Sequence, residues 1–286
     1  MQIANPIYEI TFKYLMENSD IAKDIISVIL NENVIDVELK PQETIAETRV
    51  GVRVFRLDFK ATIQKADGTL MIVLIEIQKA KKAFVIQRFR RYLGANYLFE
   101  EQTNDKKKKS SLPITTIYFL GYRLKNIKIP ILKVERTYKN ANTNRKLRNH
   151  IKENFVEQLS HDLYVIQISR LKKMGVQTEL EKMLDVFSQD KYKTADSHVL
   201  EYTGDMNDPR VARIIKYLNR AMSDEDIRRA MDAEDEVEGL VSQLEEEIEQ
   251  ERQAKEQERQ AKEQAFNEIE ILKQQIATLM KQSKKD

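Results

Sequence analysis

Residues 73–80 read VLIEIQKA, and this short stretch decides how the rest of the chain is interpreted. Its valine, leucine and isoleucine residues are typical of a strand inside a sheet. Glu76 and Gln78 interrupt the apolar run, and both face the same side because side chains alternate along a strand. A carboxylate is rarely buried unless it is paired or bound to a metal ion. The stretch therefore predicts that Glu76 has a charged partner or a cation beside it.

A second carboxylate, Asp58, lies in the preceding strand-like stretch, FRLDFKATI at residues 55–63. The loop between the two strands decides whether the carboxylates meet, because a shift of one residue moves every side chain to the other face. A three-residue loop over 66–68, ending in a glycine that tolerates positive φ, places Asp58 directly opposite Glu76. A two-residue turn would instead pair Asp58 with Ile77. The site hypothesis requires the longer loop or a β-bulge.

Two adjacent carboxylates repel each other, and a divalent cation between them removes that conflict. Carboxylate oxygens suit Mg²⁺ or Mn²⁺, and such an ion stabilises negative charge on a phosphodiester. Gln78 would then orient a water molecule or the phosphate, and Glu9, in an expected N-terminal helix, would be a further ligand. The alternative is an exposed cross-strand charge ladder, in which Asp58 and Glu76 pair with neighbouring basic residues.

The charge of the chain is unevenly distributed, although the formal net charge is only +2. Residues 224–286 carry 19 acidic and 10 basic side chains, whereas residues 1–223 carry 27 acidic and 38 basic ones. A basic body suits a polyanion such as DNA. Lys60, Arg88 and Arg91 are candidates for contacts with DNA phosphates, and a solvated helix face is the alternative for the two arginines.

The composition also narrows the class of protein. Since the chain has no cysteine, disulfides and thiolate metal sites are excluded, and its three histidines, at 150, 161 and 198, are too far apart in sequence to favour a zinc site. We find no run of about 18 apolar residues and no signal peptide. We therefore expect a cytoplasmic protein without a membrane partner.

Capping signals and periodicity predict the order of the elements. Asn5 and Pro6 predict the start of a first helix, and Asp20 predicts the cap of a second over 20–30. Two further strands follow from the apolar stretches LPITTIYFLGY and LYVIQISRL, and residues 81–100 and 171–230 have mostly helical spacing.

The C-terminal segment contains an exact seven-residue repeat, EQERQAK, at 249–255 and again at 256–262. Such a repeat predicts a coiled-coil register. We call the positions that would face a partner helix the heptad seam: Val237, Val241, Leu244, Ile248, Glu251, Lys255, Glu258, Lys262, Ala265, Ile269, Leu272, Ile276 and Leu279. Because the middle of the seam is charged, either the helix pairs through its apolar ends, giving a homo-oligomer through residues 236–286, or it remains a single charged helix.

The order helix, strand with Asp, strand with Glu-x-Gln, helix resembles the core of the PD-(D/E)XK nuclease superfamily, and within it the transposase-like branch of recombination-promoting nucleases. The matching segments are TFKYLMEN (11–18), FRLDFKATI (55–63), VLIEIQKA (73–80), RFRRYLGANY (88–97) and PITTIYFLGY (113–122). The resemblance implies an α/β fold with a mixed, mainly four-stranded sheet flanked by helices. It implies a nuclease-like core over 1–170, a helical extension over 171–235 and a coiled-coil helix over 236–286.

The resemblance also implies roles for individual residues. Asp58 and Glu76 match the metal-binding carboxylates, Ile77 lends its backbone carbonyl to Mg²⁺ or Mn²⁺, Gln78 stands where most of the superfamily has lysine, and Glu9 matches an acidic position on the first helix. Two features depart from the pattern: Leu57 replaces the proline before Asp58, and the lysine is missing, so Lys60 is the candidate replacement.

The resemblance implies a Mg²⁺-dependent DNA endonuclease linked to recombination or transposition. The alternative is a catalytically inactive module with the nuclease fold, which binds DNA or protein and oligomerises through its coiled coil. A third hypothesis makes the helical tail the functional part of an interaction protein.

Overall fold

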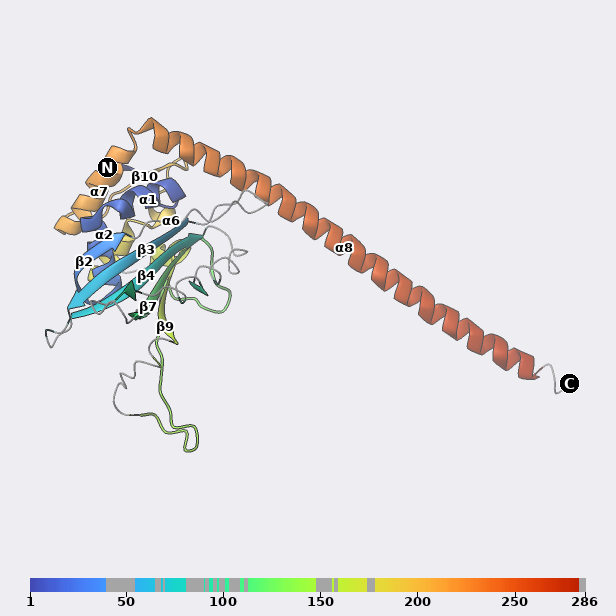
Figure 1. The fold of residues 1–286 in the computed structure, drawn as a ribbon. Helices are drawn as coiled ribbons and strands as arrows, with labels where there is room; N and C mark the ends of the chain where they lie inside the picture. The colour runs from blue at the N-terminus through green and yellow to red at the C-terminus, as the bar shows by residue number, and fades with distance from the viewer. Residues whose placement is uncertain are drawn as a thin grey trace. The chain divides into compact units, whose positions relative to one another are not determined.

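A computed structural model of the chain describes residues 1–39, 55–64, 68, 70–80, 90, 93–94, 97, 101–102, 109–110, 113–147, 156, 159–173 and 178–282. These residues form both helices and strands, so the expected α/β class is confirmed (Figure 1). The strands are β1 (Gln2–Ala4), β2 (Asn33–Leu39), β3 (Phe55–Gln64), β4 (Leu70–Ala80), β5 (Glu101–Gln102), β6 (Lys109–Ser110), β7 (Ile114–Leu120), β8 (Ile131–Val134), β9 (His161–Gln167) and β10 (Val199–Glu201). The helices are α1 (Glu9–Glu17), α2 (Ser19–Leu30), the 3₁₀-helix η2 (Ile168–Lys173), α5 (Glu179–Asp185), α6 (Gln189–Tyr192), α7 (Pro209–Ala221) and α8 (Glu225–Gln282).

The main sheet is mixed and has the strand order β2-β3-β4-β7-β9-β8. β3 pairs antiparallel with β2 and β4, whereas β4, β7 and β9 run parallel. The sheet has six strands rather than mainly four, because β2 and β8 extend its two edges. Two small sheets accompany it in the described residues, one of which joins β1 to β10.

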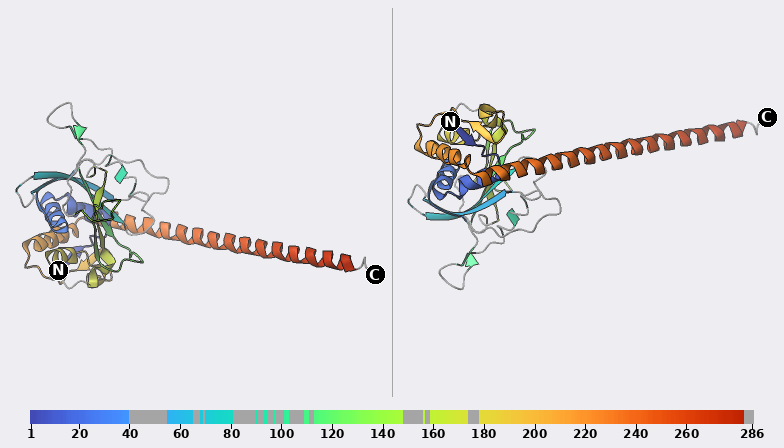
Figure 2. Two further views of the ribbon diagram at one scale, coloured as in Figure 1. Left: turned by 90° about the horizontal axis from the view of Figure 1, so that it is seen from below. Right: turned by 90° about the horizontal axis from the view of Figure 1, so that it is seen from above.

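The hydrophobic core lies on one face of the sheet, which we call the core face. Phe59, Ala61 and Ile63 of β3 are buried there, and the ring of Phe12 in α1 lies 5.1 Å from that of Phe119 in β7. Apolar residues of α2, α5 and α7 join the same cluster. Figure 1 and Figure 2 show α1, α2 and α7 together on this side of the sheet.

The opposite face, which we call the site face, has a smaller apolar cluster that includes Leu120 and Val165. Beside it, Gln167 at the end of β9 is 1% exposed. Its amide oxygen accepts hydrogen bonds from the backbone N–H of Leu124 and from Nε of Arg170. Its amide nitrogen donates to the carbonyls of Ile127 and Ile129. The buried side chain of Gln167 thus forms hydrogen bonds with backbone groups of the loop between β7 and β8.

Several expected element boundaries are wrong. The first helix begins at Glu9 rather than at Pro6. The buried Asn5 accepts a hydrogen bond from the backbone N–H of Ile7 and so caps a turn that precedes the helix, while its Nδ2 donates to Gln189 and to the carbonyl of Ser197. Asn18, and not Asp20, caps α2 by accepting a hydrogen bond from the backbone N–H of Ile21.

The region over 171–230 is mostly helical, as expected, but it also contains a strand. β10 lies within it and pairs with β1, and α5 and α7 pack into the same core as α1 and α2. The chain divides into two compact units, Met1–Glu234 and Asp235–Asp286. Residues 171–234 therefore belong to the same unit as the sheet.

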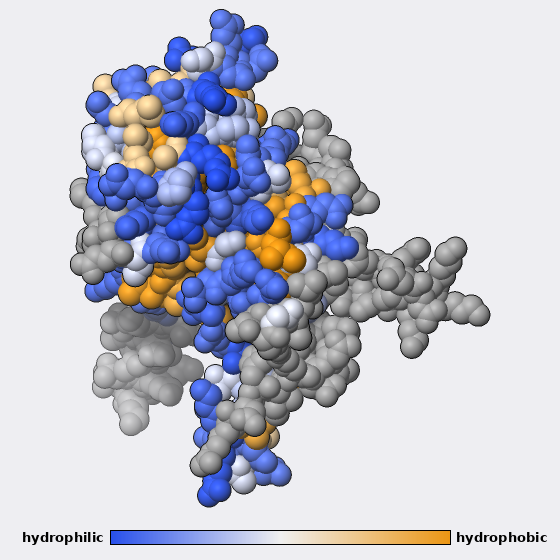
Figure 3. All heavy atoms as spheres, turned by 90° about the vertical axis from the view of Figure 1, so that its left-hand side faces the viewer, coloured by the Kyte–Doolittle hydropathy of each residue, from blue (hydrophilic) through white to orange (hydrophobic). Residues whose placement is uncertain are grey.

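The surface of the first unit is mostly polar on the face that Figure 3 shows, with apolar patches between the hydrophilic regions. The second unit consists of the part of α8 after Glu234. Within the described ranges, no helix is both long enough and apolar enough to cross a membrane.

Candidate functional site

The register of β3 and β4 pairs Asp58 directly with Glu76. Gln64 pairs with Leu70, and Gly68 between them has φ +80°, in the left-handed region that glycine tolerates best. The longer of the two expected loops is therefore confirmed at the level of register, although Lys65, Ala66, Asp67 and Thr69 lie outside the described residues. We call Asp58 and Glu76 the carboxylate pair.

The strand register gives Asp58 and Glu76 positions on the site face. Along β3, Phe59, Ala61 and Ile63 are buried in the core face, whereas Lys60 and Thr62, at the alternate positions in register with Asp58, are half-buried. For Asp58, Glu76, Ile77 and Gln78 the structure describes the strands and their register.

β7, which neighbours β4 on the side away from β3, has no basic residue opposite Glu76. Glu76 pairs with Thr116 of β7, which is buried, and Thr116 pairs with Leu163 of β9. The directly opposed neighbours of Glu76 are thus a carboxylate position and a hydroxyl. Like charges directly opposite each other destabilise a sheet, so this register needs a proton, a cation or a diagonal basic side chain to offset the repulsion.

The diagonal positions on β3 are those of Arg56 and Lys60. Arg56 pairs with Gln78, and Lys60 pairs with Leu74 on β4 and with Glu38 on β2. A cross-strand charge ladder would therefore have to be diagonal, and the direct partner of Lys60 on β2 is itself acidic. Lys60 is suitably placed on the site face for a phosphate, two residues from Asp58.

Glu9 is the first residue of α1, which packs on the core face through Phe12. Its backbone N–H donates a 2.6 Å hydrogen bond to Oε2 of Glu234 in α8. A role beside the carboxylate pair would require the Glu9 side chain to pass the end of the strands. Arg88 and Arg91 lie outside the described residues.

Analysis of the sequence alone missed three polar residues at positions on the site face of β7 and β9. Thr116 lies directly next to Glu76, and Tyr118 lies next to Gln78 on β7. His161 begins β9 on the site face, and its Nδ1 lies 2.8 Å from the hydroxyl of Tyr97. Burial lowers the pKa of His161, which favours the neutral imidazole. In the sequence, the polar residues within the otherwise apolar stretch of β7 were the one signal that could have pointed to these positions.

The carboxylate pair is the one candidate for a metal site that the register of the described strands offers. Among the side chains that the structure describes, no group of three or more histidines and carboxylates could hold a metal ion. The register nevertheless fits a divalent cation, since Cβ atoms of directly opposed residues are about 5 Å apart and two carboxylates at that separation can share one ion.

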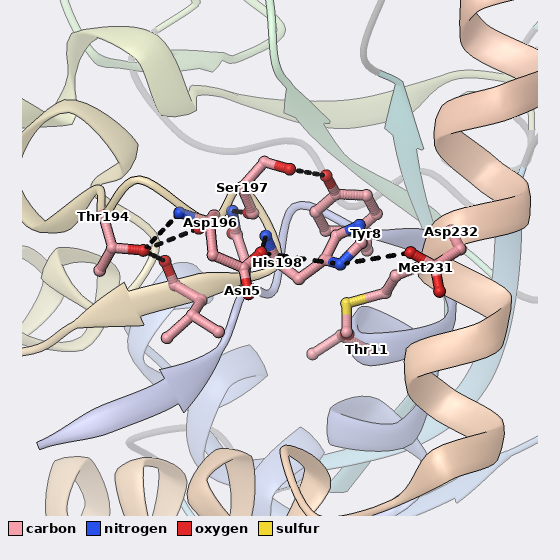
Figure 4. Close-up of polar contacts among 10 residues, drawn as sticks. Asn5, Tyr8, Thr11, Thr194, Asp196, Ser197, His198, Met231 and Asp232 are labelled. Atoms are coloured by element: carbon pink, nitrogen blue, oxygen red, sulfur yellow. Dashed lines mark hydrogen bonds and ion pairs between the residues drawn. The ribbon is translucent and has the colours of Figure 1, made fainter.

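A second polar cluster lies at the start of α1 (Figure 4). The hydroxyl of Tyr8 donates to Oγ of Ser197, and the ring of His198 lies edge-on to Tyr8 at 4.9 Å. Nδ1 of His198 lies 3.7 Å from the carboxylates of both Asp196 and Asp232. The cluster joins three distant segments of the chain, so its evident role is to hold them together.

Comparisons of the chain with protein-family models, with curated proteins and with solved structures found no match. The function is therefore argued from the residues and the sheet register.

Proposed function

We propose that the protein is a metal-dependent DNA endonuclease of the PD-(D/E)XK kind, linked to recombination or transposition. The observation that carries the proposal is the register that pairs Asp58 directly with Glu76 in the middle of the main sheet. A sheet that serves only as a scaffold gains nothing from two opposed carboxylates, whereas two carboxylates in this register suit a divalent cation.

Each residue of the candidate site has its own role in the proposed cleavage reaction. Asp58 and Glu76 would hold Mg²⁺ or Mn²⁺ with the backbone carbonyl of Ile77, and the ion would supply charge stabilisation at a phosphodiester oxygen. Gln78, two residues along the same strand face, would orient the water that attacks phosphorus. Glu9 would act as a further acidic group only by reaching around the strand ends.

Substrate binding would rest on positive charge. Residues 1–223 carry 38 basic against 27 acidic side chains, which suits the DNA backbone. Lys60 on the site face, with Arg88 and Arg91 after β4, would contact phosphates on either side of the bond that is cut. Lys60 would also supply the positive charge that Gln78 lacks.

The test is nicking of supercoiled plasmid by purified wild type and by Glu76→Ala, in Mg²⁺, in Mn²⁺ and in EDTA. We expect wild type to nick in either metal and to stop in EDTA, and the variant to lose at least about 100-fold in rate, as for removal of one key electrostatic group. Asp36→Ala, on neighbouring β2, is the matched control: it makes the same charge change at an exposed residue and should keep full activity.

A different outcome would favour a module that binds without chemistry. In that case wild type and Glu76→Ala would retard the plasmid equally and neither would cut it in any metal. Mn²⁺ binding, followed by the loss of the free-ion signal in electron paramagnetic resonance, separates an inactive metal site from the absence of one.

A further inference from the structure

The heptad seam of α8 is apolar at both ends and half-exposed along its described length. Four seam residues have exposed fractions near one half: Leu244 48%, Ile248 54%, Ile269 49% and Leu272 55%. Leucine and isoleucine at this spacing are typical of a helix that packs on another helix.

The centre of the seam is charged and its charges alternate in sign. Glu251 forms an ion pair with Lys255, and Glu258 forms one with Lys262, each within α8 and each with mostly exposed side chains. In a parallel pair of identical helices each seam residue meets its own copy. All four central layers would then oppose like charges, which is unfavourable.

An antiparallel pair turns the same residues into complementary layers. With Lys255 opposite Glu258 of a second copy, the seam matches throughout the described length: Leu244 faces Ile269, Ile248 faces Ala265, Glu251 faces Lys262 and Lys255 faces Glu258. Apolar positions meet apolar ones, and each central charge meets its opposite.

We infer that α8 binds α8 of a second copy of this chain in this antiparallel register. The register is unique among neighbouring ones, because a shift of one heptad places Glu251 opposite Ile269, or Ile248 opposite Glu258, and so puts a carboxylate in an apolar layer. The sequence of the seam, read in one direction, is complementary to the same sequence read in the opposite direction. A second copy of this chain always provides that complementary sequence, whereas a helix of another protein does not, and therefore a second copy is the partner that the seam specifies.

The separation between equivalent residues distinguishes the orientations. Residue 239 of one copy would lie opposite residue 274 of the other, so equivalent positions would be about 35 residues, or about 52 Å, apart along the helix. In a parallel pair they would lie within about 20 Å, given interaxial distances of about 10 Å.

Pulsed electron paramagnetic resonance on the full chain measures this separation. Gly239→Cys accepts a spin label, because a Cβ at Gly239 has no neighbour within 4 Å and the chain has no other cysteine. We expect a label-to-label distance near 50 Å. A distance below about 25 Å would show parallel pairing, and a monomeric mass with no dipolar coupling would show that α8 does not self-associate.

Disulfide cross-linking gives an independent check. Ile248→Cys mixed with Ala265→Cys should form a cross-linked heterodimer, whereas neither variant alone should, because equivalent residues would be about 26 Å apart. Cross-linking of either variant alone would overturn the proposal, as would failure of the mixture. Since neither measurement involves DNA, the inference stands or falls independently of the proposed nuclease activity.

Discussion

Two aspartates, one in α2 and one at the start of α7, have opposite effects on the stability of the folded chain. Asp24 of α2 is half-buried, and within the described contacts its Oδ2 has no hydrogen-bond partner, while the guanidinium of Arg213 approaches only to 3.5 Å. Burial therefore raises the pKa of Asp24. Asp208 caps α7 and accepts hydrogen bonds from the backbone N–H and the guanidinium of Arg210, which lower its pKa.

Replacing each aspartate with asparagine should reveal the difference. Because a raised carboxyl pKa means that the folded protein holds the proton more tightly, ionised Asp24 destabilises the fold at pH 7. Asp24→Asn should raise the free energy of unfolding at pH 7, and the gain should vanish as the pH falls towards about 4. Asp208→Asn should lose on the order of 1 kcal/mol at pH 7, and this loss should persist at about pH 4 because the pKa of folded Asp208 lies below its ordinary value.

Urea unfolding at pH 7 and at pH 4 provides the measurement. Each variant is the control for the other, because both make the same chemical change on adjoining helices. Equal effects of the two substitutions at pH 7 would contradict the assignment.

At the scale of an element, the turn after β10 is held by two tyrosines above a buried carboxylate. Asp185 is 3% exposed and pairs with Nζ of Lys191 at 2.9 Å and with the hydroxyl of Tyr192. The rings of Tyr192 and Tyr202 lie 4.8 Å apart, and desolvation by burial raises the pKa of both hydroxyls. The backbone of Gly204 passes directly over these hydroxyls.

Gly204→Ala should disturb this arrangement. A Cβ at Gly204 would lie 2.5 Å from the hydroxyl oxygen of Tyr202 and 2.7 Å from that of Tyr192. We expect a loss of about 1–3 kcal/mol in the free energy of unfolding, because the ring that bonds to Asp185 has to move.

Gly239→Ala is the matched control for this prediction. Gly239 lies in α8 with no atom within 4 Å of its added Cβ, so alanine should raise helix stability by up to about 1 kcal/mol. Thermal unfolding followed by circular dichroism distinguishes the two substitutions. An unchanged melting temperature for Gly204→Ala would show that the turn relaxes freely.

At the scale of the whole molecule, the first turns of α8 belong to the first unit. Ile227 and Met231 are buried with Ala4, Tyr8 and Ala221 in a separate apolar cluster. The division between the two compact units falls after Glu234, inside the helix. One continuous helix therefore both completes the core of the first unit and carries the heptad seam.

Two truncations should separate these functions. A chain ending at residue 240 keeps Ile227 and Met231 and should unfold at the same temperature as the full chain, while losing self-association. A chain ending at residue 224 should lose on the order of 3 kcal/mol, because two large apolar side chains no longer cover Tyr8. Calorimetry together with sedimentation measures both properties. A large loss of stability in the longer chain would contradict the division.

The sequence by itself determined the features that depend on local pattern. Alternation along β3 and β4 and the glycine between them reduced the register of Asp58 to two alternatives, because strand faces and loop geometry are set by neighbouring residues, and the structure has the one that pairs Asp58 with Glu76. The seven-residue repeat predicted the long C-terminal helix for the same reason.

Only the tertiary structure decided the features that depend on distant residues. The side-chain amide of Asn5 is anchored to Gln189 and to the carbonyl of Ser197, more than 180 positions away, while its Oδ1 also accepts from the backbone N–H of Ile7. β10 exists because β1 offers it an edge, and Thr116 lies beside Glu76 because β4 and β7 run parallel across a long connection. No local pattern contains these pairings, since the partners meet only when the sheet and its covering helices assemble.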